Sequence, residues 1–224
     1  MSPAFMPRAP GWRALTLAGL LAVAPLAYAE SGCLLDLGHG WPPATQNHGS
    51  AVEELFADGD VPALSLVRLP VRGKESGVML MRPVGGNTAW ALRSASASER
   101  VDSVSTIPGG ISRSLKTDQS PKVREVPMPA ALAERLLDTW QRALQATVPA
   151  GSEAVFHDGE LLLFTVGDQR VTGLEPSCGP ARMLVRQSLL LIEASDTKEK
   201  NRGKRWRDLA QSLDKLDGQL AGVD

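Results

Sequence analysis

A helix followed by a β-meander is predicted by two neighbouring segments, PMPAALAERLLDTWQRALQAT (residues 127–147) and EAVFHDGELLLFTVGDQRVTG (residues 153–173). In the first segment, apolar side chains recur at spacings of three and four residues, from Leu132 to Leu144. Arginine and glutamate occupy the opposite face, which is the pattern of an amphipathic helix that covers a core. We expect this helix over 129–147.

The second segment predicts three strands joined by tight turns. Asp158-Gly159 separates 153–156 from 160–166, and Gly167-Asp168 separates that strand from 170–173. An Asp-Gly pair suits the positive φ angles of a two-residue hairpin turn. The segment therefore predicts a three-stranded antiparallel meander.

Further strands are predicted upstream, where short runs of strand-forming residues lie between turn residues. They span 63–69, 78–81, 88–92, 111–116 and 123–126. The first two of these form a hairpin. The serine-rich stretch 94–106 fits an exposed strand or a polar loop, and Pro108-Gly109-Gly110 predicts a turn.

The remaining segments of the expected domain are helical or irregular. A short helix is expected from Ser50 to Gly59, and residues 31–49 are expected to be mostly loop because they are rich in glycine, proline and polar residues. A second long helix is predicted over 180–194, with Pro180 at its first position. The predicted fold class is α+β, a single domain over 30–196 with an antiparallel sheet packed by the long helices.

After this domain we expect a basic linker over 197–205 and an amphipathic helix over 206–221. The apolar residues of that helix repeat at alternating spacings of three and four: Trp206, Leu209, Leu213, Leu216 and Leu220. Such a narrow apolar seam fits packing on the chain's own domain or on a partner.

The first 29 residues have the pattern of a secretory signal peptide, which is removed on export. Arg8 and Arg13 form a positive segment, residues 14–26 are apolar, and Ala27-Tyr28-Ala29 resembles a cleavage site. The apolar run is shorter than the about 20 residues that a membrane-spanning helix needs. We expect a periplasmic or secreted protein without a transmembrane span after cleavage, with an uncleaved anchor as the alternative.

The chain has two cysteines, Cys33 and Cys178. Disulfides form and persist in the compartments to which exported proteins go, and an even number of cysteines favours pairing. We therefore predict a Cys33–Cys178 disulfide.

Composition and motifs limit the function classes. Lys plus Arg total 24 and Asp plus Glu total 25, so the formal net charge is −1. Dedicated nucleic-acid-binding domains are usually basic, so no nucleic-acid partner is expected. The sequence contains no phosphate-binding, dinucleotide-binding, zinc-protease or serine-hydrolase motif, and no cofactor or metal is expected.

His157, Asp158 and Glu160 are the weak candidates for acid–base catalysis. They flank the expected turn of the meander, and a His-Asp pair can move protons if a pocket holds it. A hairpin tip is normally solvated, however, and turn geometry already accounts for Asp158-Gly159. The simpler interpretation is that these are solvated turn residues.

His39 and His48 stand nine positions apart in the expected N-terminal loop and could share a metal with Asp36. No regular element fixes that spacing, so polar loop residues are the simpler interpretation. Trp41, in the same stretch, is the one aromatic expected to be exposed. The other aromatics whose positions the pattern assigns to a core are Trp90, Trp140, Phe156 and Phe164.

The basic run before the last helix is the candidate binding segment. It consists of Lys198, Lys200, Arg202, Lys204, Arg205 and Arg207. Three roles are open: a solvated linker, a contact with a partner protein that also uses the leucine seam, or attraction to an anionic surface.

Together these observations favour an exported, non-catalytic binding or envelope-accessory protein. The expected partner is another protein or an anionic envelope component. The alternatives are an exported hydrolase with an unrecognised active site, or an inhibitor or immunity-type protein.

Overall fold

The computed structural model describes residues 35–84 and 89–222. The chain divides into two units, Met1–Ser31 and Gly32–Asp224, and every described residue belongs to the second unit. The expected signal peptide and Cys33 lie outside the described residues. Export and the Cys33–Cys178 disulfide therefore remain predictions.

Nine strands and four helices are formed by the described residues. In chain order they are β1 (Leu37–His39), α1 (Pro43–Ala57), β2 (Pro62–Leu69), β3 (Ser76–Met81), β4 (Trp90–Ser96), β5 (Asp102–Ile107), β6 (Gly110–Leu115), β7 (Lys122–Met128), α2 (Ala130–Thr147), β8 (Leu161–Val166), β9 (Gln169–Gly173), α3 (Gly179–Asp196) and α4 (Glu199–Leu220). The predicted α+β class, with an antiparallel sheet and a C-terminal helix, is confirmed.

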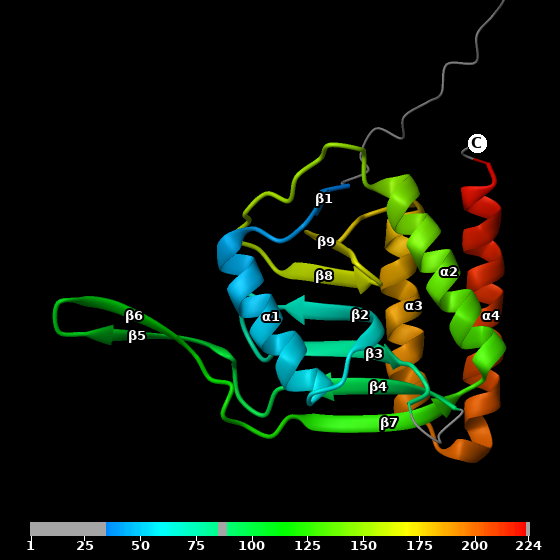
Figure 1. Ribbon diagram of the computed structural model, residues 1–224, viewed down its shortest axis with the longest axis horizontal. Coiled ribbons are helices and arrows are strands. Elements are labelled where there is room, and N and C mark those ends of the chain that lie inside the picture. The colour runs from blue at the N-terminus through cyan, green and yellow to red at the C-terminus, as the bar shows by residue number, and fades with distance from the viewer. Residues whose placement is uncertain (1–34, 85–88, 223–224) are drawn as a thin grey trace, which may run out of the picture. The chain divides into compact units, whose positions relative to one another are not determined.

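Seven strands form one antiparallel sheet in the order β1-β9-β8-β2-β3-β4-β7 (Figure 1). In its centre, Leu66 of β2 pairs with Val78 of β3 on one side and with Phe164 of β8 on the other. These central strands are nearly continuous apolar runs because both faces of the sheet are covered.

Helices cover the two faces of the sheet in different ways (Figure 1). α1 packs on one face, α2 and α3 pack on the other, and α4 packs on α2 and α3. Successive side chains of a strand point to opposite faces. In β8, Leu161 and Leu163 therefore join the α1 core, while Leu162 and Phe164 join the core beneath α2 and α3.

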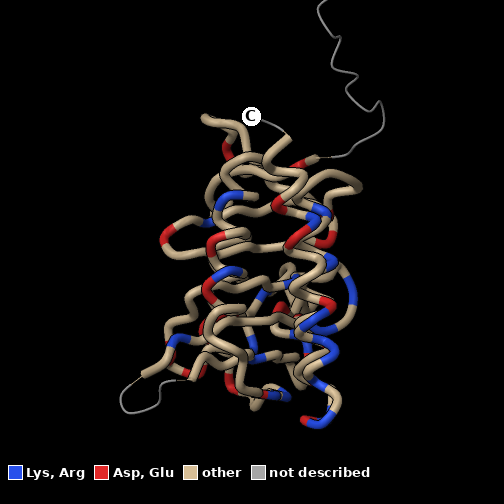
Figure 2. Tube along the Cα trace, turned by 90° about the vertical axis from the view of Figure 1, so that its right-hand side faces the viewer, with Lys and Arg blue, Asp and Glu red and all other residues tan. Residues whose placement is uncertain are grey.

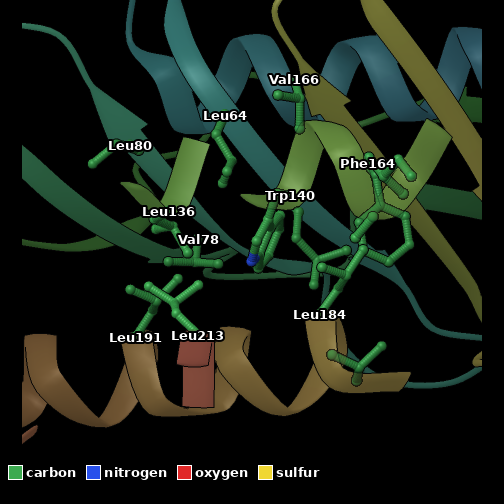
Figure 3. Close-up of a cluster of buried hydrophobic side chains, with 14 of the residues drawn as sticks. Leu64, Val78, Leu80, Leu136, Trp140, Phe164, Val166, Leu184, Leu191 and Leu213 are labelled. Atoms are coloured by element: carbon green, nitrogen blue, oxygen red, sulfur yellow. The ribbon is translucent and has the colours of Figure 1, made fainter. Parts of the chain in front are cut away.

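Trp140 of α2 is fully buried in the larger core (Figure 3). Its ring meets that of Phe164 edge to face, with 6.2 Å between the centroids. Its indole Nε1 donates to Oε1 of Gln187 over 2.7 Å, which satisfies the polar atom inside the core. The helix predicted over 129–147 is thus confirmed together with its apolar face.

The expectation for the N-terminal stretch 31–49 was wrong. Residues 37–39 pair with β9, and α1 begins at Pro43 rather than at Ser50. Proline is tolerated in the first helical turn, where its missing N–H needs no partner. Gly49 lies inside the helix at a close approach, since a Cβ there would stand 2.3 Å from Leu163 Cδ2.

The first strand of the predicted meander, 153–156, was also wrong. Only Glu153 makes a bridge, with His39, while β8 and β9 form the predicted hairpin around Gly167-Asp168. Phe156, expected in the core, is 55% exposed. The predicted hairpin does not form because β2 pairs with the edge of β8 that this segment would have needed.

The predicted linker 197–205 was wrong as well, because α4 begins at Glu199 and runs through the basic residues. The helix itself was predicted correctly. Leu209, Leu213, Leu216 and Leu220 are buried in the larger core, so the seam packs on the chain's own helices. Within the described part of the chain, no helix has the length and apolar character that crossing a membrane requires.

Candidate functional site

β5 and β6 form a separate two-stranded hairpin, which we call the arm (Asp102–Leu115). It extends away from the seven-stranded sheet (Figure 1), and its strands pair only with each other. Pro108 and Gly109 form its turn, with Gly109 at a φ of 97°, so the predicted Pro-Gly-Gly turn is confirmed. An isolated two-stranded hairpin is marginally stable in water, so additional contacts would stabilise the arm.

The two faces of the arm differ in chemistry. The pairs Val104–Arg113 and Thr106–Ile111 lie on one face, because directly opposed residues share a face. The other face carries the serine pairs Ser103–Ser114 and Ser105–Ser112, and also Ile107 opposite Gly110. Four apolar side chains of the arm are exposed: Val104 (61%), Ile107, Ile111 (76%) and Leu115.

The edges of the arm carry charged side chains only near its root, where Asp102 and Arg113 pair with each other. Residues 103–112 contain no charged side chain. The main sheet differs, since its edge strand β7 carries Lys122, Arg124, Glu125 and Pro127, and its other edge strand, β1, has three residues. Charges, proline and short strands protect a sheet edge from pairing with another chain. The arm is therefore the less protected edge.

A pocket of about 160 Å³ lies at the root of the arm. Its lining combines residues of α1, the segment after β2, the arm and the loop before β8. The polar lining residues are Thr45, His48, Arg100, Asp102, Arg113, His157 and Asp158. The exposed apolar side chains of Val71 and Phe156 also line it.

Glu75, which is fully buried, ties the root of the arm to α1. One carboxylate oxygen accepts from the backbone N–H of Val101 over 2.8 Å, and the other accepts from that of Asp102 over 3.2 Å. His48 Nε2 lies 2.9 Å from Oε1 of Glu75. Burial raises the pKa of Glu75, but the hydrogen bonds from His48 and the backbone outweigh it and lower the pKa to about 2.

Asp102 and Arg113 join the two strands of the arm at this root. Arg113 Nε donates to Oδ1 of Asp102 over 2.6 Å, and a second guanidinium nitrogen donates to Oδ2 over 3.1 Å. The hydrogen bond with Asp102 raises the pKa of Arg113. Arg100 also donates to the backbone oxygens of Val71 and Asp102. The charged groups here thus hold the arm in place.

The structure places two of the three catalytic candidates, His157 and Asp158, at one pocket and the third, Glu160, outside its lining. His157 lines the root pocket and pairs with Asp36, with 3.0 Å between Nε2 and Oδ2. Asp158 also lines this pocket. Glu160 instead accepts two hydrogen bonds from Arg68, over 2.6 and 3.1 Å.

His39 and His48 are likewise not used together. His39 is exposed in β1, while His48 is buried in α1 beside Glu75. Asp36, which could have shared a metal with these two histidines, pairs instead with His157. Among the residues that the structure describes, no cluster of three metal-ligating side chains occurs.

Trp41 was expected to be exposed and is buried. Arg170 lies over its ring, with 4.3 Å from the guanidinium carbon to the ring centroid. The aromatic ring exposed near the root pocket is instead that of Phe156. Trp41 is therefore buried where exposure was expected, and Phe156 is exposed where burial was expected.

The basic residues between Lys198 and Arg207 fall into two groups. Arg202 donates to the carbonyl oxygens of Ala194 and Thr197, and Arg205 pairs with Glu193 and Asp208. The second group has no ion-pair partner within residues 35–84 and 89–222, and consists of Lys198, Lys200, Lys204 and Arg207. This second group is free to meet an external anion.

Sequence reasoning missed Glu75, Asp102 and Arg113. Glu75 stands in the polar run Arg72-Gly73-Lys74-Glu75-Ser76, which has the composition of an exposed turn. Its burial depends on α1 and the root of the arm meeting at this point, a long-range contact without a local sequence signal. No protein-family model, no curated protein and no solved structure matches the chain.

Proposed function

We propose that this is an exported, non-catalytic protein of the cell envelope that binds another protein through the arm. The observation that carries the proposal is the set of exposed apolar side chains on a hairpin whose outer part, residues 103–112, carries no charge. Exposed apolar groups on an extended element whose outer part carries no charge are typical of a surface that a partner covers. Pairing of a partner strand with the arm would add main-chain hydrogen bonds to this apolar contact.

The root pocket extends this surface. Val71 and Phe156 add exposed apolar area beside the arm, and Phe156 is a large aromatic of the kind that anchors interfaces. Two polar residues that line the pocket are engaged within the chain, His48 by the buried Glu75 and Asp102 by Arg113. Polar side chains that are already held by hydrogen bonds within the chain favour binding over catalysis at this pocket.

The test is site-specific photo-crosslinking in cells that produce the full-length chain. A photoreactive residue replaces Ile111 on the arm, or Val61 at a control position. Val61 precedes β2 and is 85% exposed, so it samples random encounters equally well. We expect one discrete adduct with another protein at position 111 and none at 61. The same adducts at both positions, or none at 111, would refute the proposal.

An exported hydrolase is the second candidate, favoured by one observation. His48 and His157 line the same pocket although they are distant in sequence. If the pocket is catalytic, His157→Ala abolishes a hydrolytic activity detected against a panel of ester, peptide and glycoside substrates. An unchanged melting temperature would separate this loss from unfolding.

A further inference from the structure

The exposed cations of α4 form a stripe that lies apart from the arm and the root pocket. Lys200, Lys204 and Arg207 stand at positions i, i+4 and i+7 and therefore share one face of the helix. All three are exposed. Lys and Arg gather toward the N-terminal end of this helix, in the lower part of Figure 2.

The chain itself does not neutralise the stripe. Like charges at i and i+4 repel each other and destabilise a helix slightly. The C-terminal half of the same helix is different, because Asp217 accepts hydrogen bonds from Arg135 and Arg142 of α2. Within the described segments, Lys200, Lys204 and Arg207 have no such acidic partner. An external anion would relieve this repulsion.

A hollow of about 560 Å³ lies along the stripe. It is lined by Lys200, Lys204 and Arg207, and also by Asn201 and Gly203. Gly203 leaves space between the cations, since a Cβ added there would meet only Arg207, at 3.9 Å. Cationic and amide donors around a shallow hollow suit a phosphate group.

We propose that this stripe docks the protein on a membrane surface through the phosphate groups of anionic lipids. The stripe rises about 1.5 Å per residue, so it covers roughly 10 Å from Lys200 to Arg207 and can meet more than one headgroup. Anionic lipids attract clustered Lys and Arg without insertion of the protein.

The apolar side of α4 supports attachment by charge alone. Leu209 and Leu213 are buried in the core, and Trp206 packs against it, so the helix keeps no apolar face for the acyl chains. Salt should therefore release the protein from lipid.

The experiment is co-sedimentation of the full chain with vesicles. One set contains equal parts of phosphatidylglycerol and phosphatidylcholine, and the other contains phosphatidylcholine alone. The test variant is Lys200→Gln/Lys204→Gln/Arg207→Gln. The matched control is Arg72→Gln/Lys122→Gln/Arg186→Gln, which removes three exposed cations elsewhere and gives the same net charge. Circular dichroism melts verify that both variants fold.

We expect the unchanged protein and the control to bind the anionic vesicles at low salt and to be released near 0.5 M NaCl. The test variant should bind on the order of 100-fold more weakly, given the usual contribution of each cation near an anionic surface. Equal losses in both triple variants would overturn the proposal, as would no binding to anionic vesicles. Binding of the unchanged protein to polygalacturonate beads but not to vesicles would reassign the stripe to polysaccharide. None of these outcomes bears on the crosslinking at Ile111.

Discussion

The main sheet and the arm are both antiparallel, but they differ in what covers them. The main sheet has α1 on one face and α2 and α3 on the other, and its edge strands are short or carry charges and proline. The arm has two strands, exposed apolar side chains and no charge between Ser103 and Ser112. The main sheet buries its apolar residues against the helices of the chain, whereas the arm exposes its apolar residues to solvent. The first arrangement stabilises the fold, and the second leaves a surface for binding.

The largest effect on stability is expected from Leu213→Ala. This substitution tests whether α4 packs on the helices that cover the main sheet. Leu213 is fully buried, and truncating a buried leucine typically lowers the free energy of unfolding by about 2–5 kcal/mol. Urea unfolding measures the loss. Leu189→Ala on α3 is the control, since Leu189 is 48% exposed and should change stability little. Equal small losses would mean that α4 does not pack on the body.

The second prediction concerns acid stability and Glu75, at the junction of the two regions. Its pKa is lowered from 4.5 to about 2, so the charged form stabilises the fold above pH 4.5, and this contribution is lost as the pH falls toward 2. The shift corresponds to about 3 kcal/mol. Glu75→Gln should therefore be less stable than the unchanged protein at pH 7, and the gap should close near pH 2.

Urea unfolding at several pH values measures that gap. Glu54→Gln is the control, because Glu54 is an exposed residue of α1. A gap between Glu75→Gln and the unchanged protein that stays constant from pH 7 to pH 2 would contradict the assigned role of the Glu75 carboxylate.

The sequence predicted the main sheet and its helices better than it predicted the junction at Glu75, where α1 meets the root of the arm. The runs around Leu66 and Phe164 are apolar enough to identify buried strands, and the leucine seam of α4 identifies its buried side. Glu75 has no such signal, because its burial is produced by segments that are distant in sequence. The start of α1 at Pro43 was missed because proline and glycine were interpreted as loop residues.

The candidate site was predictable only in part. Residues 94–106 allowed an exposed strand, and the turn at Pro108-Gly109 was clear. The placement of the exposed Val104 and Ile111 on one face of the arm, however, follows from the cross-strand register. Such a register is set by the turn and by contacts at the root, and composition alone does not give it.

A smaller effect is expected from Asp102→Asn, which weakens the ion pair that closes the root of the arm. Arg113 is about half exposed, so the loss should be about 1 kcal/mol. We expect the loss to be local, with faster hydrogen exchange in β5 and β6 and unchanged exchange in β2 and β8. Asp168→Asn, at the exposed β8–β9 turn, is the control. Faster exchange throughout the main sheet would show that the two regions unfold together.

The smallest effect is expected from Val104→Ser on the arm, compared with the same change at Val78 of β3. Val78 is 1% exposed, so serine there leaves a cavity and a buried hydroxyl, and stability should fall by about 2 kcal/mol or more. Val104 is largely exposed, so the change should be within about 0.5 kcal/mol in dilute, purified protein. Denaturant unfolding of both variants measures the contrast. A large loss at Val104 would show that its side chain is already covered in the isolated protein, which would leave no apolar face for a partner to bind.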